Sequence, residues 1–126
     1  MRRSPDADAE RLRSLPRRHV LGLDVPVAAD FRSRLLGLGG LSREQAGTGL
    51  LLPRCASVHT FGMRFELDLI FLDWQDRPLA AFHRVPPRRL AWSRTAAAVL
   101  EIPSPAGGEF VGARDLGEPC CRRDRR

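Results

Sequence analysis

Residues 65–73 constrain the fold more than any other part of the sequence. The segment reads Phe-Glu-Leu-Asp-Leu-Ile-Phe-Leu-Asp, and from Leu69 onward apolar side chains occupy both faces of an extended chain. A short apolar run of this kind predicts a strand in the interior of a sheet. Turn-forming residues follow at 74–78, and residues 79–85 then predict an antiparallel partner that completes a β-hairpin.

Shorter strands are predicted on either side of this hairpin. They cover residues 19–25, 49–53 and 96–103, with an edge strand at 118–121. Pro86 and Pro87 interrupt the sheet because proline cannot donate a backbone hydrogen bond. Arg88, Arg89 and Trp92 are therefore expected in a solvated loop with one packed aromatic ring, and the alternative is that they bind an anion or a base.

Helices are predicted to be few and short. Asp30 is a suitable N-cap for a helix over 31–38, with glycines at its end. Ser42 and Gln45 match a capping box, and residues 109–116 predict one or two helical turns. We therefore predict an α+β fold that is mainly β: a small, twisted, largely antiparallel sheet or partly open barrel with one or two short helices.

The length of 126 residues predicts one domain, which we place at residues 18–121. Residues 1–17 and 122–126 are polar and rich in arginine, and we expect them to be disordered tails. A short amphipathic helix over 8–15, with Leu12 and Leu15 on one side, is the alternative within the first tail.

The positive charge of the chain lies in these ends. Residues 1–20 hold six arginines and three acids, residues 122–126 hold four arginines and one aspartate, and the segment between them is neutral. A domain that tracks nucleic acid normally carries positive charge on its folded body, so we expect no more than non-specific, salt-dependent contacts through the tails. All 21 basic residues are arginine, and lysine, asparagine and tyrosine are absent, which indicates a GC-rich bacterial genome.

The compartment predicted is the cytoplasm. No apolar run approaches the ~20 residues that span a bilayer, and no apolar segment of a secretory signal follows the first residues. Three cysteines, Cys55, Cys120 and Cys121, form an odd set that argues against a disulfide framework. No membrane association is expected, because no apolar run is long enough to span a bilayer.

The loop over residues 55–64 carries the most chemistry. In an extended chain its alternate residues, Cys55, Ser57, His59, Phe61 and Met63, share one face. A cysteine and a histidine there suggest a metal site or a nucleophile–base pair, with an aspartate from the next strand as third member. Residues four apart in a strand are ~13 Å apart along its axis, however, which is too far to ligate one ion. We therefore predict no metal, no cofactor and no catalytic residue.

Asp68 is the residue of this region that most needs a partner. It lies between Leu67 and Leu69 in the predicted central strand, where a carboxylate is costly unless it is paired and hydrogen-bonded. We expect its partners to be Arg64, His59 or backbone N–H groups of the turn over 60–62. A loop clamped in this way would also preorganise a small binding site.

The same loop, Cys-Ala-Ser-Val-His-Thr-Phe-Gly-Met-Arg over 55–64, resembles the family known as domain of unknown function 192. Supporting motifs are Arg34-Leu35-Leu36-Gly37-Leu38, Leu67-Asp68-Leu69, Phe71-Leu72-Asp73 and Val99-Leu100-Glu101-Ile102-Pro103. The resemblance covers roughly residues 19–121. It departs from the family in a longer turn at 103–108 and in Gly117-Glu118, where the family has Gly-Asp. It implies a compact, mostly β fold and no reaction.

Three functions follow as hypotheses. We favour a non-catalytic accessory module that binds a small molecule or a peptide segment with the loop 55–68. The residues expected at this site are Cys55, His59, Thr60, Phe61, Met63, Arg64, Asp68 and Glu101. The alternatives are a small enzyme or metal site built on Cys55, His59 and Asp68, and weak nucleic-acid association through the tails.

Overall fold

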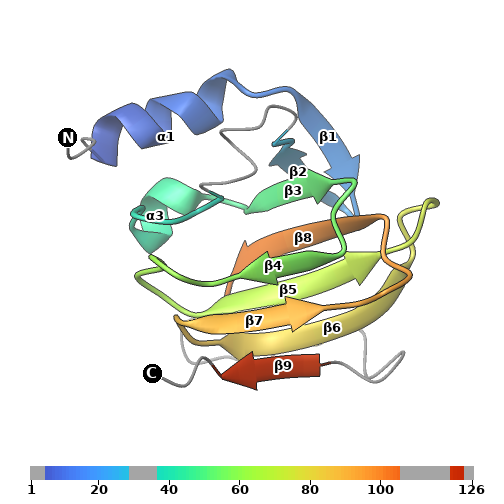
Figure 1. Cartoon of the computed structure of the whole chain (residues 1–126). Coiled ribbons are helices and arrows are strands. Elements are labelled where there is room, and N and C mark those ends of the chain that lie inside the picture. The colour runs from blue at the N-terminus through green and yellow to red at the C-terminus, as the bar shows by residue number, and fades with distance from the viewer. Residues whose placement is uncertain (1–4, 29–36, 106–119, 124–126) are drawn as a thin grey trace.

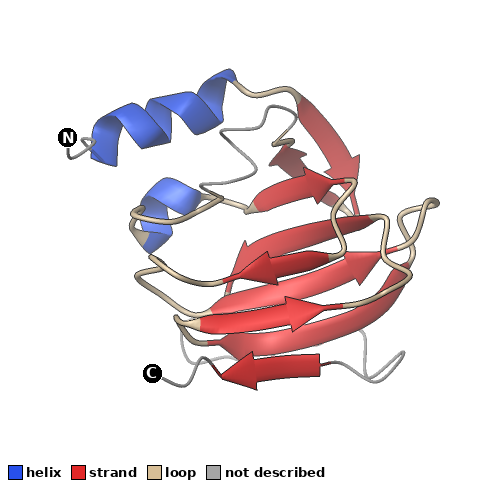
Figure 2. Cartoon of the chain, in the orientation of Figure 1, coloured by secondary structure: helices blue, strands red, loops and turns tan. Residues whose placement is uncertain are grey.

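The computed structural model describes residues 5–28, 37–105 and 120–123 (Figure 1). Strands predominate over helices in this part of the chain, and all strand pairings between named strands are antiparallel (Figure 2). They form three open sheets of two, four and three strands and do not close into a barrel. The predicted mainly β class is thus confirmed.

The central sheet has four strands in the order β3-β8-β5-β6. Their bounds are β3 (Leu50–Pro53), β5 (Leu67–Leu72), β6 (Pro78–Val85) and β8 (Ala98–Pro103). Every residue of β5 is buried, and this strand lies between β8 and β6, as its apolar sequence predicts. The predicted β5–β6 hairpin is confirmed, and Asp73 Oδ1 stabilises its turn by accepting hydrogen bonds from the N–H groups of Gln75 and Arg77 at 2.8 and 2.9 Å.

A second sheet has the order β4-β7-β9. Its strands are β4 (Ser57–His59), β7 (Arg89–Trp92) and β9 (Cys120–Arg123). The solvated loop predicted for Arg89 to Trp92 is wrong: after the two prolines, Arg88 has a positive φ of 65°, and the chain then enters β7. The predicted edge strand is present as β9, which pairs only with β7 among the described strands.

The first predicted strand, 19–25, is instead a two-stranded hairpin. It consists of β1 (Arg17–Val20) and β2 (Leu23–Pro26). The two residues between them, Leu21 and Gly22, both have positive φ, 51° and 80°. Tight hairpins favour such a pair because its twist matches that of the strands. An apolar residue at the first turn position concealed this turn in the sequence.

Two helices are present in the described part of the chain. They are α1 (Pro5–Ser14) and α3 (Arg43–Ala46). Leu12 of α1 and Leu15 just beyond its end are both buried, which fits the alternative of a short amphipathic helix in this segment. The domain limits at residues 18 and 121 stay a prediction. No helix among these residues is long and apolar enough to cross a membrane.

The short helix α3 has the predicted capping box. Ser42 Oγ accepts a hydrogen bond from the Gln45 N–H at 3.2 Å, and Gln45 Oε1 accepts one from the Ser42 N–H at 3.0 Å. The helices predicted over 31–38 and 109–116 fall on residues outside the described ranges, apart from 37–38, which belong to a turn over 37–40.

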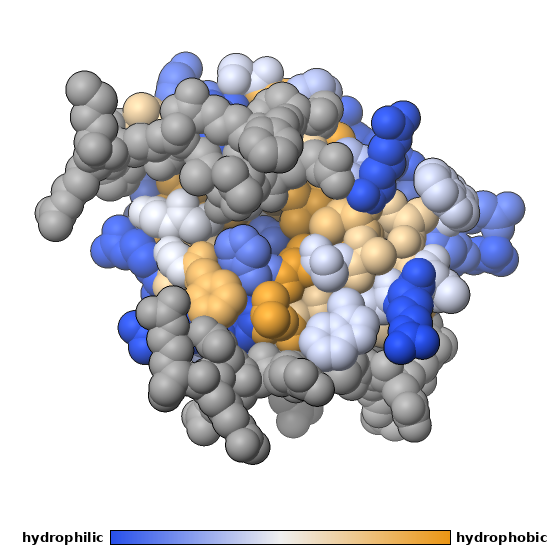
Figure 3. All heavy atoms as spheres, in the orientation of Figure 1, coloured by the Kyte–Doolittle hydropathy of each residue, from blue (hydrophilic) through white to orange (hydrophobic). Residues whose placement is uncertain are grey.

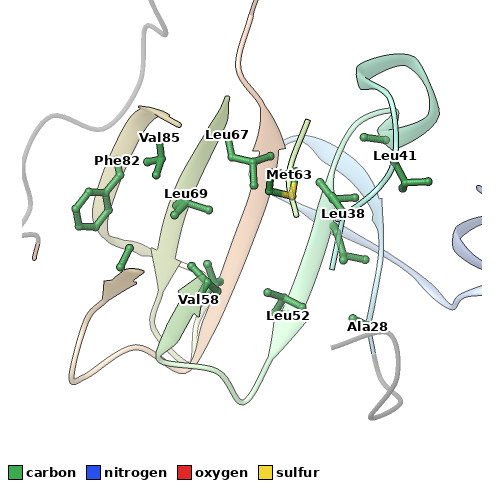
Figure 4. Close-up of a cluster of buried hydrophobic side chains, with 14 of the residues drawn as sticks. Ala28, Leu38, Leu41, Leu52, Val58, Met63, Leu67, Leu69, Phe82 and Val85 are labelled. Carbon is green, nitrogen blue, oxygen red and sulfur yellow. The ribbon is translucent and has the colours of Figure 1, made fainter. Parts of the chain in front are cut away.

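The core lies on both faces of the central sheet. On one face, Leu67, Leu69 and Phe71 belong to one core cluster with Val58 of β4 and Ala91 of β7. Figure 4 shows Leu67, Leu69 and Val58 within this cluster. On the other face, β5 and β8 pack under the β1–β2 hairpin, and the residues of this cluster include Val20, Val25, Ile70, Leu72 and Leu100.

The pleat of β5 and β8 places two buried acids on opposite faces of the central sheet. Glu101 is opposite Leu69 in the register, so it points toward the second sheet. Asp68 is opposite Ile102 and points the other way, toward the β1–β2 hairpin side. This separation decides which predicted site residues can meet.

Asp68 is fully buried, and its predicted partners are wrong. Its Oδ1 accepts hydrogen bonds from the Arg84 N–H at 2.9 Å and from Ser104 Oγ at 2.7 Å, and His83 Nδ1 lies 3.6 Å from Oδ2. The β5–β6 register shifts between Leu67 and Leu69, and Arg84 has a positive φ of 54°. Asp68 therefore holds a β-bulge in place, and it points away from the loop that contains Arg64 and His59.

Candidate functional site

A pocket of about 70 Å³ opens between the central sheet and β4. Its lining residues come from the turn 37–40, β3, the segment 55–63 and β8; they are Gly37, Leu38, Leu52, Cys55, Ser57, Val58, His59, Phe61, Met63 and Glu101. Figure 3 shows hydrophobic and hydrophilic side chains exposed side by side on this face. The structure thus brings together five of the eight predicted site residues: Cys55, His59, Phe61, Met63 and Glu101.

Glu101 is the chemically distinctive residue of the pocket. Its side chain comes from the central strand β8, and only 4% of the residue is exposed. The Leu38 backbone N–H donates to its carboxyl group, whereas Oε2 is buried and accepts no hydrogen bond. Burial raises the pKa of Glu101 to about 7, and the Leu38 hydrogen bond opposes this rise without cancelling it.

Gly37 lets the backbone approach this carboxyl group closely. It has a positive φ of 53°, and a Cβ atom at this position would lie 3.2 Å from Glu101 Oε2. A side chain here would therefore press on the carboxyl oxygen and fill space beside it. The sequence predicts for Gly37 only a place at a helix end, and the motif Arg34-Leu35-Leu36-Gly37-Leu38 is the signal that could place it at the site.

Cys55 and His59 lie at the other side of the pocket. The Cys55 thiol donates a hydrogen bond to the Ser57 carbonyl oxygen at 2.9 Å and is half-buried. His59 is exposed, and its ring lies against Phe61 with 5.6 Å between the ring centres. The strand β4 spans only Ser57–His59, and a turn at 61–62 follows. The extended segment predicted over 55–63 is thus shorter than expected, although all five alternate residues line the pocket.

The other three predicted residues do not line the pocket. Thr60 is buried, and its Oγ1 donates to the Pro86 carbonyl oxygen at 2.7 Å and accepts from the Arg89 N–H at 2.9 Å, which ties β4 to the start of β7. Arg64 is exposed. Asp68 lies on the opposite face of the central sheet, so the imagined set of Cys55, His59 and Asp68 does not assemble.

The arrangement can bind a small group rather than an ion held by several ligands. Within residues 5–28, 37–105 and 120–123, no three His, Cys, Asp or Glu residues lie close enough together to hold a metal. The pocket combines one buried acid with apolar walls from Leu52, Val58 and Met63. Such a site suits a ligand with an apolar body and one polar group.

A sequence model of domain of unknown function 192, described as an uncharacterised ACR, matches residues 14–109. The chain belongs to this family. The match spans every pocket residue, from Gly37 to Glu101, and it confirms the resemblance seen in the loop 55–64. The domain of unknown function 192 family has no assigned reaction in its description.

Two further comparisons accompany the family match. None of the curated proteins searched matches the chain. A crystal structure of a protein of unknown function from Novosphingobium aromaticivorans DSM 12444, at 1.22 Å resolution, is similar to it with 18% identity and a TM-score of 0.49. That similarity covers 72% of this chain and 83% of the other one.

The raised pKa of Glu101 predicts a pH-dependent stability. The folded chain keeps this proton up to a pH of about 7, whereas the ordinary value is 4.5, so the folded state holds more protons between these values. The free energy of unfolding should therefore fall as the pH rises through this window, by about 3 kcal/mol, and level off above it. The other titratable groups that line the pocket are Cys55 and His59.

Glu101→Gln tests this by urea unfolding at pH 5 and pH 8. We expect the loss of stability between the two pH values to be smaller in the variant than in the wild-type protein by about 3 kcal/mol. Glu66→Gln, at an exposed glutamate, should keep the wild-type dependence. An unchanged dependence in Glu101→Gln would show that this carboxyl group ionises normally.

Proposed function

We propose that this protein is a non-catalytic binding module that holds a small molecule in the pocket between Gly37 and Glu101. The observation that carries the proposal is the buried Glu101 Oε2 atom, which faces the pocket without a hydrogen-bond partner among the described residues. A buried acceptor left without a donor costs about 1–3 kcal/mol, and a ligand that supplies the donor recovers this energy.

The volume limits what can bind. A water occupies about 30 Å³ in the liquid, so a pocket of about 70 Å³ has room for about two waters or a group of similar size. This fits a small metabolite, or one part of a larger molecule that extends past the exposed Ser57 and His59. It is too small for a nucleotide or a cofactor of comparable size.

Binding is favoured over catalysis by the state of the candidate reactive groups. The Cys55 thiol proton is held by the Ser57 carbonyl oxygen rather than by a base. Asp68 would be the acid that orients a histidine in a nucleophile–base pair. Its Oδ1 instead accepts a hydrogen bond from the Arg84 N–H at the β-bulge, on the other face of the sheet. Activation of a nucleophile requires these groups in contact, so their separation supports the binding role.

The cellular setting belongs to the same proposal. We infer that the protein acts in the cytoplasm of a bacterium with a GC-rich genome, and that nucleic acid meets only its arginine-rich ends. The composition and the distribution of charge support both points.

A pair of glycine variants tests the pocket as the binding site. A library of small fragments is first screened by NMR for compounds that shift the signals of Leu38 and the Met63 methyl group. Gly37→Ala adds a methyl group 3.2 Å from Glu101 Oε2, and we expect it to weaken binding of these compounds roughly tenfold or more.

Gly40→Ala is the matched control. Gly40 also has a positive φ, 79°, but a Cβ atom there meets nothing within 4 Å, so this variant carries similar backbone strain without filling the pocket. It should retain wild-type affinity. The proposal fails if no fragment shifts these signals, or if Gly37→Ala binds the fragments as well as Gly40→Ala does.

A further inference from the structure

Among the described residues, the lining of the pocket holds one buried acid and no basic side chain that could neutralise it, apart from the exposed His59. Among the described residues that line the pocket there is neither arginine nor any other permanent cation. A buried carboxylate without a counter-charge is costly, and the cost is relieved by protonation or by a cation brought from outside. Arg11 of α1 lies outside the lining and donates from Nη2 to the Gly37 carbonyl oxygen at 3.3 Å. Within the lining of the free protein, protonation of Glu101 is the available route, and it agrees with the raised pKa of Glu101.

We infer that the ligand is a small primary amine whose ammonium group enters the pocket and pairs with Glu101 Oε2. This rests on the proposed function. The Leu38 backbone N–H already donates a hydrogen bond to the Glu101 carboxyl group. The ligand therefore has to supply a donor only to the other oxygen, Oε2. An ammonium group supplies both this donor and the missing positive charge.

The rest of the lining suits the other parts of an alkylamine. The alkyl chain lies against Leu52, Val58 and Met63. The volume holds the ammonium group and the first carbon atoms, and the rest of a four-carbon amine extends past the exposed Ser57 and His59.

An alcohol of the same size is uncharged, whereas the alkylammonium ion carries a positive charge. A hydroxyl group can donate to Oε2 of the carboxylate or accept from the protonated carboxyl group, but it brings no positive charge, so its affinity should depend on the protonation of Glu101 far less than that of an ammonium ion. An alkylammonium ion stays charged well above neutral pH, as lysine does. Its affinity should therefore rise as Glu101 loses its proton, whereas that of the alcohol should not.

The test is a pair of NMR titrations with n-butylammonium and n-butanol, which have equal numbers of non-hydrogen atoms. Binding is followed through the Leu38 amide and the Met63 methyl signals at pH 5.5 and at pH 8. At pH 8 we expect the amine to bind about tenfold more tightly than the alcohol, and at pH 5.5 we expect little preference. Glu101→Gln should lose the preference at pH 8, whereas Glu66→Gln, on the surface, should retain it.

The outcomes separate the two proposals. Equal or tighter binding of n-butanol at pH 8, or amine binding that survives Glu101→Gln unchanged, overturns the amine and leaves the pocket as a binding site. Failure of both molecules to shift the two signals overturns the amine and, together with a failed fragment screen, the pocket as well.

Discussion

Replacing Gly49 with alanine should lower the free energy of unfolding by about 3 kcal/mol or more, because it combines a strained backbone with a collision. Gly49 has a φ of 128°, and a Cβ atom there would lie 2.3 Å from the Glu101 carbonyl oxygen. This oxygen belongs to the backbone of β8, so it cannot move aside without disturbing the pairing of Leu50 with Glu101. The same displacement would shift Glu101 in the pocket.

Gly47→Ala is the matched control for this variant. Gly47 lies two residues earlier and has a φ of 60°, but a Cβ atom there would meet nothing within 4 Å. It should therefore cost only the strain of this backbone conformation (φ 60°, ψ −130°), about 1–3 kcal/mol, and less than Gly49→Ala, which adds a collision to its own strain. Both variants are compared with the wild-type protein by urea unfolding at one pH. Equal effects of the two substitutions would contradict the close approach of Gly49 to β8.

Replacing Asp68 with alanine should destabilise the fold by about 3 kcal/mol. The change removes the acceptor for the Arg84 N–H and for Ser104 Oγ, and it leaves both donors without this partner in the β-bulge. Because Asp68 is fully buried, water cannot replace the lost bonds without entering the core. The fall in stability should be measured by urea unfolding, and ligand binding in the pocket should persist wherever the variant is folded, because the two sites lie on opposite faces.

An exposed aspartate serves as the control for Asp68. Asp24 pairs with Arg17 at 2.9 Å on the surface, where such ion pairs contribute at most about 1 kcal/mol. Asp24→Ala should therefore change the stability far less than Asp68→Ala. A similar, small effect of both substitutions would mean that Asp68 is not a buried structural acid.

Much of the central sheet could be predicted because its signals are local. The apolar run of β5, the turn after it and the prolines after β6 each act on their immediate neighbours. The β1–β2 hairpin was missed because Leu21, an apolar residue with positive φ, occupies a turn position that usually carries a polar residue or glycine. The strand β7 was missed because its pairing with β4 depends on residues about thirty positions away.

The site was predicted in part for the same reason. Cys55, His59, Phe61 and Met63, which alternation along 55–63 places on one face, all line the pocket, although Val58 from the opposite face lines it as well. Whether Asp68 or Glu101 completes that surface depends on the pleat and register of β5 against β8, which the sequence of either strand alone does not specify. Gly37 joins the site only through the fold, as the close neighbour of Glu101 Oε2.

Glu101 is a buried acid that faces a pocket and lacks a partner for one oxygen among the described residues. A carbon-13 NMR titration of its side-chain carboxyl carbon, assigned by comparison with Glu101→Gln, measures this directly in the full chain. We predict a titration midpoint near pH 7 for the ligand-free protein. A midpoint near the ordinary value of 4.5 would show that the carboxyl group is solvated or already paired, and it would contradict both the binding site and its preference for an amine.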